Sequence, residues 1–160
     1  MIRKNITGSP FKILLVEDNP AHAELVIRSF KDHELTSDIY HVVNGELALD
    51  YLFRRGEFVD EEEYPLPHVI LLDIRMPKVN GLEVLKELKS SEQLRHIPVV
   101  ILTTSDAEQD VISAYKYYVN SYLVKPVEFD KFMQLMEEMG FYWLHWNQHQ
   151  RAAPGAPRMI

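Results

Sequence analysis

The stretch Val69-Ile-Leu-Leu-Asp73 decides the fold that we expect, because it is a continuous apolar run that ends on a carboxylate. Two further runs, Lys12-Ile-Leu-Leu-Val16 and Val99-Val-Ile-Leu102, have the same character. Runs without polar alternation are typical of strands buried on both faces of a parallel sheet. A weaker, alternating run at Asp38–Val43 predicts an edge strand, and Ser121–Val124 predicts a fifth strand.

Helical patterns alternate with these strands. Asn19 and Pro20 form a helix start, with Asn as the N-cap and Pro in the first turn, ahead of apolar residues at helical spacing. The same spacing predicts four more helices, over residues 45–55, 81–91, 106–119 and 129–146. Because right-handed crossovers join parallel strands, this alternation predicts an open, five-stranded α/β sheet of order 2-1-3-4-5 with helices on both faces, a flavodoxin-like fold.

Three segments lie outside this repeat. Residues 56–67 contain two prolines and the acidic run Asp60–Glu63, and predict a solvated surface loop. Residues 1–10 are predicted to be a flexible N-terminus, and residues 141–160 an aromatic helix extension followed by a tail rich in Ala, Pro and Gly. Residues 11–140 are left as one globular domain.

Composition and charge exclude several classes of function. Seventeen Lys and Arg against 24 Asp and Glu give a net charge of −7, which disfavours nucleic acid and anionic membrane surfaces as partners. The chain has no cysteine, so disulfides, thiolate nucleophiles and Cys-ligated metals are excluded. No stretch is a signal peptide or approaches the roughly 20 apolar residues that span a bilayer, so we expect a cytoplasmic protein. Seven histidines without metal-ligand spacing are predicted to be surface or loop residues.

Side chains that carry chemistry follow four of the five predicted strands. In such sheets ligands bind outside the carboxyl ends of the strands, so the residues directly after each apolar run are the candidates for a site. They are Glu17, Asp18, Asp73, Thr103, Thr104, Lys125 and Pro126. Three carboxylates at one edge repel one another, and a divalent cation relieves that repulsion. Oxygen ligands without Cys favour magnesium or manganese over zinc.

This ordered set resembles the receiver domains of two-component response regulators. The resemblance rests on the acidic pair Glu17-Asp18, on Asp73-Ile-Arg-Met-Pro77 followed by Gly81, on Thr103 and on Lys125-Pro126. Thr103 lies 30 residues after Asp73, and Lys125 lies 22 residues after Thr103, as in that family. The similarity covers roughly residues 11–140, which we therefore interpret as a receiver domain.

The resemblance implies a phosphoacceptor site. Asp73 would attack the phosphorus of a phosphohistidine on a partner kinase. Glu17, Asp18 and Asp73, with the backbone carbonyl of Arg75, would hold Mg²⁺, which neutralises the equatorial phosphoryl oxygens. By this resemblance the protein is a signalling phosphoacceptor rather than an enzyme, with self-catalysed phosphoryl transfer and slow autodephosphorylation.

The resemblance also implies a switch. Lys125 would pair with a phosphoryl oxygen, and Thr103 would move to hydrogen-bond the acyl phosphate. Tyr122 matches the family's switch aromatic, whose ring turns inward when the threonine moves. The peptide bond between Lys125 and Pro126 would be cis, so that the lysine is aimed back into the site.

Partners follow from three further segments. The helix Gly45–Leu52, the acidic insertion at residues 56–67 and the run Phe141-Tyr-Trp-Leu144 resemble the stand-alone regulators that serve bacterial and cyanobacterial phytochrome kinases. A sensor histidine kinase of the phytochrome type is therefore the implied partner. The surplus of large apolar side chains at 141–146 predicts a homodimer through the last helix and the tail, unless these rings fold back over their own helices.

Other functions stay open on the residues alone. A haloacid-dehalogenase-type phosphohydrolase also uses an Asp nucleophile with Mg²⁺, but it places a second Asp where this chain has Arg75. Neither Arg75 nor Ser105 is a strong base for activating water. A receiver-like scaffold that takes no phosphate is the other alternative. A DNA-binding output domain is not expected, because only about 20 residues follow Gly140.

Overall fold

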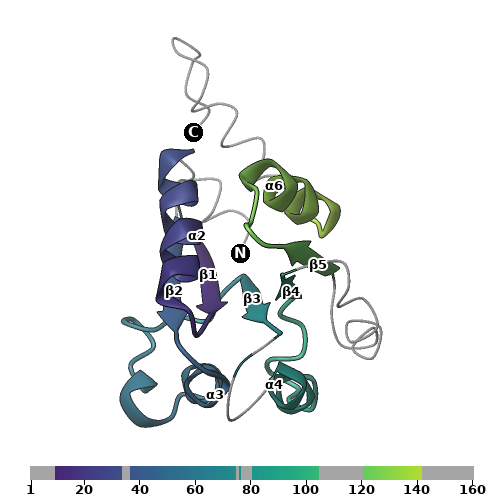
Figure 1. The fold of residues 1–160 in the computed structure, drawn as a ribbon. Coiled ribbons are helices and arrows are strands. Elements are labelled where there is room, and N and C mark those ends of the chain that lie inside the picture. The colour runs from purple at the N-terminus through teal and green to yellow at the C-terminus, as the bar shows by residue number, and fades with distance from the viewer. Residues whose placement is uncertain (1–9, 34–36, 75, 77–80, 105–120, 142–160) are drawn as a thin grey trace, which may run out of the picture.

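Five parallel strands form one sheet in the computed structural model, which describes residues 10–33, 37–74, 76, 81–104 and 121–141. The order β2-β1-β3-β4-β5 is the predicted one (Figure 1). The weaker predicted strand, β2, lies at an edge of the sheet, as its alternation indicates. The strands are β1 (Phe11–Val16), β2 (Ser37–Val42), β3 (Val69–Asp73), β4 (Val99–Thr103) and β5 (Ser121–Val124).

Helices cover both faces of the sheet (Figure 1). On one face lie α2 (Pro20–Asp32) and α6 (Phe129–Glu138), and on the other lie α3 (Gly45–Leu52) and α4 (Gly81–Lys89). The helix predicted over residues 106–119 lies outside the described residues. No helix within the described ranges is both long and apolar enough to cross a membrane.

Each central strand contributes to two apolar layers. Along β3, Val69 and Leu71 pack with the helices α2 and α6, whereas Ile70 and Leu72 pack with α3 and α4. Successive side chains of a strand point to opposite faces, so a strand covered on both sides needs an apolar residue at every position. All five residues of β3 are buried, which explains why its sequence does not alternate.

The start of α2 agrees with its sequence, but α3, α4 and α6 end before their predicted ends, α4 by two residues at Lys89. Asn19 caps α2 by accepting the backbone N–H groups of Ala21 and His22. The predicted helix over 45–55 ends at Leu52, and Arg54 then adopts a left-handed φ of 58°.

The last helix ends earlier than predicted, and residues 142–146 of the predicted helix lie outside the described residues. α6 ends at Glu138, and Gly140 has a φ of 99° that L-residues rarely adopt. Phe141 then donates its backbone N–H to the carbonyl of Met136 and turns its ring onto Phe11, with ring centroids 5.2 Å apart. The first aromatic residue after the helix therefore packs on its own domain.

The insertion before β3 is more firmly attached than its acidic sequence predicts. Phe58 is buried, and the ring of Tyr64 packs edge-on against both Tyr51 and Phe58. The Tyr51 hydroxyl donates to the carbonyl of Pro65 at 2.7 Å, and burial raises the pKa of that hydroxyl. The carboxylates of Asp60–Glu63 are exposed, as expected for a solvated charge run.

His68 lies in the bend before β3, in keeping with its prediction as a surface or loop residue, but it is half-buried and connects the start of β3 to β1. Its Nδ1 accepts the backbone N–H of Lys12 at 2.9 Å, and its ring stacks on Phe11 with centroids 4.9 Å apart. Burial, and secondarily the charge of Lys12, lower the pKa of His68 from 6.5 to about 4. The ring is therefore neutral in the folded protein near neutral pH.

Acid should weaken the fold through His68. The unfolded chain protonates this ring near pH 6.5 and the folded chain near pH 4, so the unfolded state binds more protons between these values. The stability that the neutral ring contributes is present above pH 6.5 and is lost as the pH falls through about 4. We expect a loss of about 1–2 kcal/mol, discounted for the partial exposure of the ring.

Urea unfolding of the wild type and of His68→Asn, at several pH values across this window, measures the effect. Asn keeps an acceptor for the Lys12 N–H but does not titrate. The variant should lose less stability on acidification, and an identical pH dependence in the two proteins would contradict the assignment.

Candidate functional site

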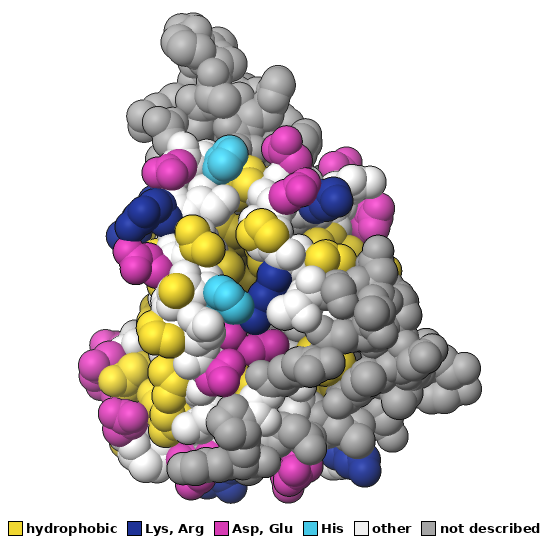
Figure 2. Space-filling model, viewed as in Figure 1, with side chains coloured by type: hydrophobic (Ala, Val, Ile, Leu, Met, Phe, Trp, Pro, Cys, Tyr) yellow, Lys and Arg dark blue, Asp and Glu magenta, His cyan; other side chains and the backbone are white. Residues whose placement is uncertain are grey.

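The predicted site residues come together at the carboxyl edge of the sheet. Glu17 and Asp18 follow β1, Asp73 and Thr103 end β3 and β4, and Lys125 follows β5. Among the described residues, the buried polar or charged ones are Glu17, Asp73 and Thr103, which are 1%, 4% and 0% exposed. Figure 2 shows acidic side chains gathered with basic side chains and a histidine near the middle of one face. Polar burial is thus concentrated where the strands end.

Three carboxylates form a cluster that fits a divalent cation. One oxygen from each of Glu17, Asp18 and Asp73 lies within 4.8 Å of the others. For bonds of about 2.1 Å, neighbouring ligands of an octahedral Mg²⁺ ion lie about 3.0 Å apart and opposite ligands about 4.2 Å apart, so these oxygens would move closer together on binding. Asp18 is exposed, which leaves room for the water ligands that Mg²⁺ retains. Three carboxylates beside one ammonium group also leave a net negative charge, which a divalent cation balances.

Lys125 is the cation within this cluster. Its Nζ lies 2.6 Å from Glu17 Oε1 and 3.4 Å from Asp73 Oδ2, and its side chain is 11% exposed. Its backbone N–H donates to the carbonyl of Thr103 at 2.7 Å, which extends the β4–β5 pairing to the site. The peptide bond to Pro126 is cis, as predicted.

Two histidines belong to this edge, although the sequence predicted surface positions for them. His41 Nε2 lies 2.8 Å from the backbone carbonyl of Glu17 and donates to it, which ties the acidic loop to β2. His22 Nδ1 lies 3.3 Å from Lys125 Nζ. The available signals were weak: His22 stands four residues after Asp18 in the first turn of a helix, and His41 stands near the carboxyl end of a strand.

Both the backbone and the side chain of Glu17 are held by contacts with other residues. Its N–H donates to the carbonyl of Val42 at 3.1 Å, and its Oε2 accepts the backbone N–H of Asn19 at 3.3 Å. Oε1 lies 2.6 Å from Lys125 Nζ in an ion pair, although it accepts no hydrogen bond among the described residues. The first acidic residue therefore has a fixed orientation before any ligand binds.

The predicted switch residues lie on neighbouring strands. Thr103 is fully buried at the end of β4, and Thr104 after it is exposed. Tyr122 on β5 lies in register with Ile101 and packs, half-buried, against the apolar layer of α3 and α4. Arg75, whose backbone carbonyl was predicted to bind the metal, lies outside the described residues.

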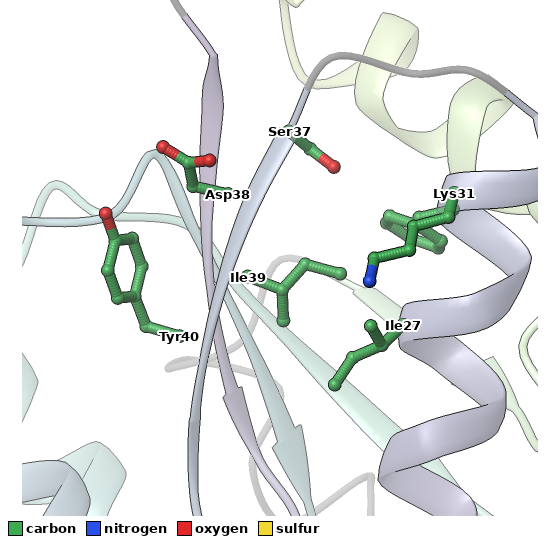
Figure 3. A pocket seen from close by; sticks show the side chains of 7 residues that line it. Ile27, Lys31, Ser37, Asp38, Ile39 and Tyr40 are labelled. Atoms are coloured by element: carbon green, nitrogen blue, oxygen red, sulfur yellow. The ribbon is translucent and has the colours of Figure 1, made fainter.

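A pocket of about 430 Å³ lies elsewhere, between α2 and β2 (Figure 3). Ile27, Lys31 and Ile39 point into it, whereas Asp38 and Tyr40 point to the other side of the strand. The pocket lies toward the amino end of β2, so it is separate from the carboxyl edge that holds the acidic cluster.

Comparison with known families agrees with this geometry. Residues 13–137 match the family model described as the response regulator receiver domain. The chain belongs to that family. The acidic cluster, the buried threonine and the lysine of this receiver domain occupy the strand ends from which the sequence resemblance was drawn.

Two curated relatives cover most of this receiver domain. One, from Methanothrix harundinacea, is named "Probable methanogenesis regulatory protein FilR2" and is 48% identical over 139 residues, 87% of each chain. The other, response regulator Rcp1 of Synechocystis, is 38% identical over 138 residues, 86% of this chain and 92% of Rcp1.

Three solved structures have the same fold. The bacteriophytochrome response regulator RtBRR is 48% identical with a TM-score of 0.73, covering 82% of this chain and 78% of that one. The phosphorylated cyanobacterial phytochrome response regulator RcpA is 35% identical, with a TM-score of 0.67 and coverage of 85% and 95%. The Mn²⁺-bound form of Rcp1 is 39% identical, with a TM-score of 0.61 and coverage of 84% and 95%.

Metal binding should depend on Asp18. A ligand that binds the folded state at a hundredfold excess over its Kd stabilises that state by about 2.7 kcal/mol, so Mg²⁺ should raise the Tm of the wild type. In Asp18→Asn this rise should largely disappear. The metal-free variant should also melt above the metal-free wild type, because one of three mutually repelling charges is gone.

Thermal melts with Mg²⁺, with Mn²⁺ and with chelator test this expectation. Asp38→Asn is the matched control, since it removes an exposed carboxylate near the amino end of β2. Equal metal-induced shifts in wild type and Asp18→Asn would show that the cluster is not a metal site.

Proposed function

We propose that this response regulator accepts a phosphoryl group on Asp73 from a sensor histidine kinase, in a reaction that needs Mg²⁺. The observation that carries the proposal is the placement of Asp73. Its buried carboxylate lies 3.4 Å from the Lys125 ammonium and within the three-carboxylate cluster. A nucleophilic oxygen, a group that balances phosphoryl charge and a set of metal ligands thus meet at one point.

The proposed transfer follows from these groups. An oxygen of Asp73 attacks the phosphorus of a phosphohistidine, and the bond from phosphorus to the imidazole nitrogen breaks with its electron pair on the nitrogen. Glu17, Asp18 and Asp73, with the backbone carbonyl of Arg75, would hold Mg²⁺, which when bound neutralises charge on the equatorial oxygens. Lys125, which forms an ion pair with Asp73 in the structure, would form a hydrogen bond with a phosphoryl oxygen.

We propose that phosphorylation changes the conformations of Thr103 and Tyr122. Thr103 hydroxyl would hydrogen-bond the acyl phosphate, and the half-buried ring of Tyr122 would turn inward on the neighbouring strand. The register of β4 with β5 supports this coupling, because Tyr122 lies opposite Ile101, two residues before Thr103. Output through contacts with other proteins is the expected consequence.

The proposed partner is a histidine kinase of the phytochrome type, and the proposed location is the cytoplasm. RtBRR and RcpA support the choice of kinase, because the first is a bacteriophytochrome response regulator and the second a cyanobacterial phytochrome response regulator. FilR2 is named for methanogenesis and is as similar in sequence as RtBRR. The test of function therefore compares a phytochrome kinase with a histidine kinase that has no phytochrome sensor.

Asp73→Asn should abolish phosphorylation, because an amide oxygen is a poor nucleophile toward phosphorus. The measurement is intact mass after incubation with acetyl phosphate and Mg²⁺, in which the wild type should gain one phosphoryl group. Chelator should suppress that gain, and Asp130→Asn, which changes an exposed carboxylate on α6, should label like the wild type.

A second arm uses radiolabelled kinases as donors. An autophosphorylated bacterial phytochrome should transfer its label faster than a histidine kinase without a phytochrome sensor. Labelling that survives in Asp73→Asn would overturn the assignment of the acceptor. Equal rates from both kinases would overturn only the choice of partner.

We also propose that the protein forms a homodimer through the segment after α6. The surplus of aromatic side chains at 142–146 carries this proposal, and these residues lie outside the described ranges. Phe141 no longer belongs to that surplus, because it packs against Phe11 and His68.

Truncation after Phe141 should convert a dimer into a monomer while keeping the ring contacts of the domain. Light scattering on the full chain and on the truncated chain at micromolar concentration measures both states. A monomeric full chain, or a truncated chain that stays dimeric, would remove this segment from the interface.

A further inference from the structure

Lys125 has three partners in the structure, and one of them is not a carboxylate. Its Nζ lies 2.6 Å from Glu17 Oε1, 3.3 Å from His22 Nδ1 and 3.4 Å from Asp73 Oδ2. An ammonium group has three N–H donors and no acceptor. The contact with His22 is a hydrogen bond, whereas Glu17 Oε1 forms an ion pair with the lysine and accepts no hydrogen bond within the described part of the chain.

The imidazole of His22 is held in place by the start of α2. His22 is in the first turn, where its backbone N–H donates to the Asn19 side chain at 3.2 Å. The ring is half-buried beside the acidic edge. Lys125, by contrast, reaches the site through a long side chain whose torsions must all be restrained. The backbone of His22 is thus held at the helix start, and its two side-chain torsions leave the ring fewer positions than the four torsions of Lys125 leave the ammonium group.

We propose that His22 is a positioning residue for phosphoryl transfer, whose Nδ1 lone pair accepts a hydrogen bond from Lys125 and keeps Nζ beside Asp73. This inference rests on the proposed function of Asp73. The bond requires the tautomer with its proton on Nε2, because Nδ1 must offer a lone pair to an ammonium group.

Competition for the lysine explains why a third contact matters. The shortest contact of Nζ is with Glu17, which is 1% exposed, and this ion pair draws the ammonium away from Asp73. The carboxylates of both residues also belong to the cluster that fits a cation, whereas His22 does not. The nitrogen of His22 therefore remains available to the lysine when carboxylate oxygens are engaged elsewhere.

Substitution of His22 should slow phosphoryl transfer without changing the metal site. Loss of one hydrogen bond worth about 0.5–1.5 kcal/mol predicts that His22→Ala reduces the rate constant of labelling by roughly two- to tenfold. His22→Asn should recover most of the rate, because its Oδ1 can occupy the place of Nδ1 and accept the same bond. His96→Ala, an exposed histidine before β4, is the matched control and should label like the wild type.

The experiment uses the full chain with acetyl phosphate and Mg²⁺, and follows intact mass over time. Mg²⁺-induced Tm shifts are measured on the same proteins, and should be equal in His22→Ala and the wild type. Equal labelling rates in these two proteins would overturn the inference. So would His22→Asn as slow as His22→Ala, because the ring would then act by packing rather than as an acceptor.

The proposed function fails in a different way. A wild-type protein that takes no label from acetyl phosphate or from a kinase would overturn the role of Asp73, and the role of His22 with it. If the wild type takes the label, and His22→Ala, His22→Asn and His96→Ala are labelled at the wild-type rate, only the inference about His22 is overturned.

Discussion

A buried carboxylate held by a nearly buried ammonium group is the interaction on which this site depends. Glu17 is 1% exposed and would be costly to ionise in the interior without a partner, and Lys125 supplies that partner at 2.6 Å. The pair joins the loop after β1 to the loop after β5, and β3 and β4 lie between these two strands in the sheet. Removing Lys125 would leave the buried Glu17 carboxylate without its ion-pair partner, so the pair favours the arrangement in which the two loops lie together.

The sheet makes this pairing possible. Parallel strands end at the same edge, so side chains far apart in the sequence meet there without long loops. The two apolar layers keep the central strands from shifting, because all of their residues except the half-buried Lys12 are buried on one face or the other. A rigid scaffold of this kind lets three carboxylates lie within 4.8 Å of one another in spite of their repulsion.

Histidine has three structural roles in this receiver domain. His41 bonds the backbone of Glu17, His22 bonds Lys125, and His68 accepts an N–H from the first strand. Each ring contacts a segment distant in sequence, and none of the three contributes to the carboxylate cluster. Their spacing along the chain therefore carries little information, which explains why a search for metal-ligand spacing places them on the surface.

The sequence by itself determined what depends on short-range pattern. Apolar runs determined the strands and their order, the cap formed by Asn19 determined the start of α2, and polar residues at the ends of those runs determined which side chains reach the site. Tertiary structure decided whatever depends on contacts across the sheet. It ended α6 at Glu138, where Gly140 adopts a positive φ and Phe141 meets Phe11, although the apolar spacing continues. It also paired Lys125 with Glu17 and His22, because burial and the separation of charges are set by the packed chain and not by neighbouring residues.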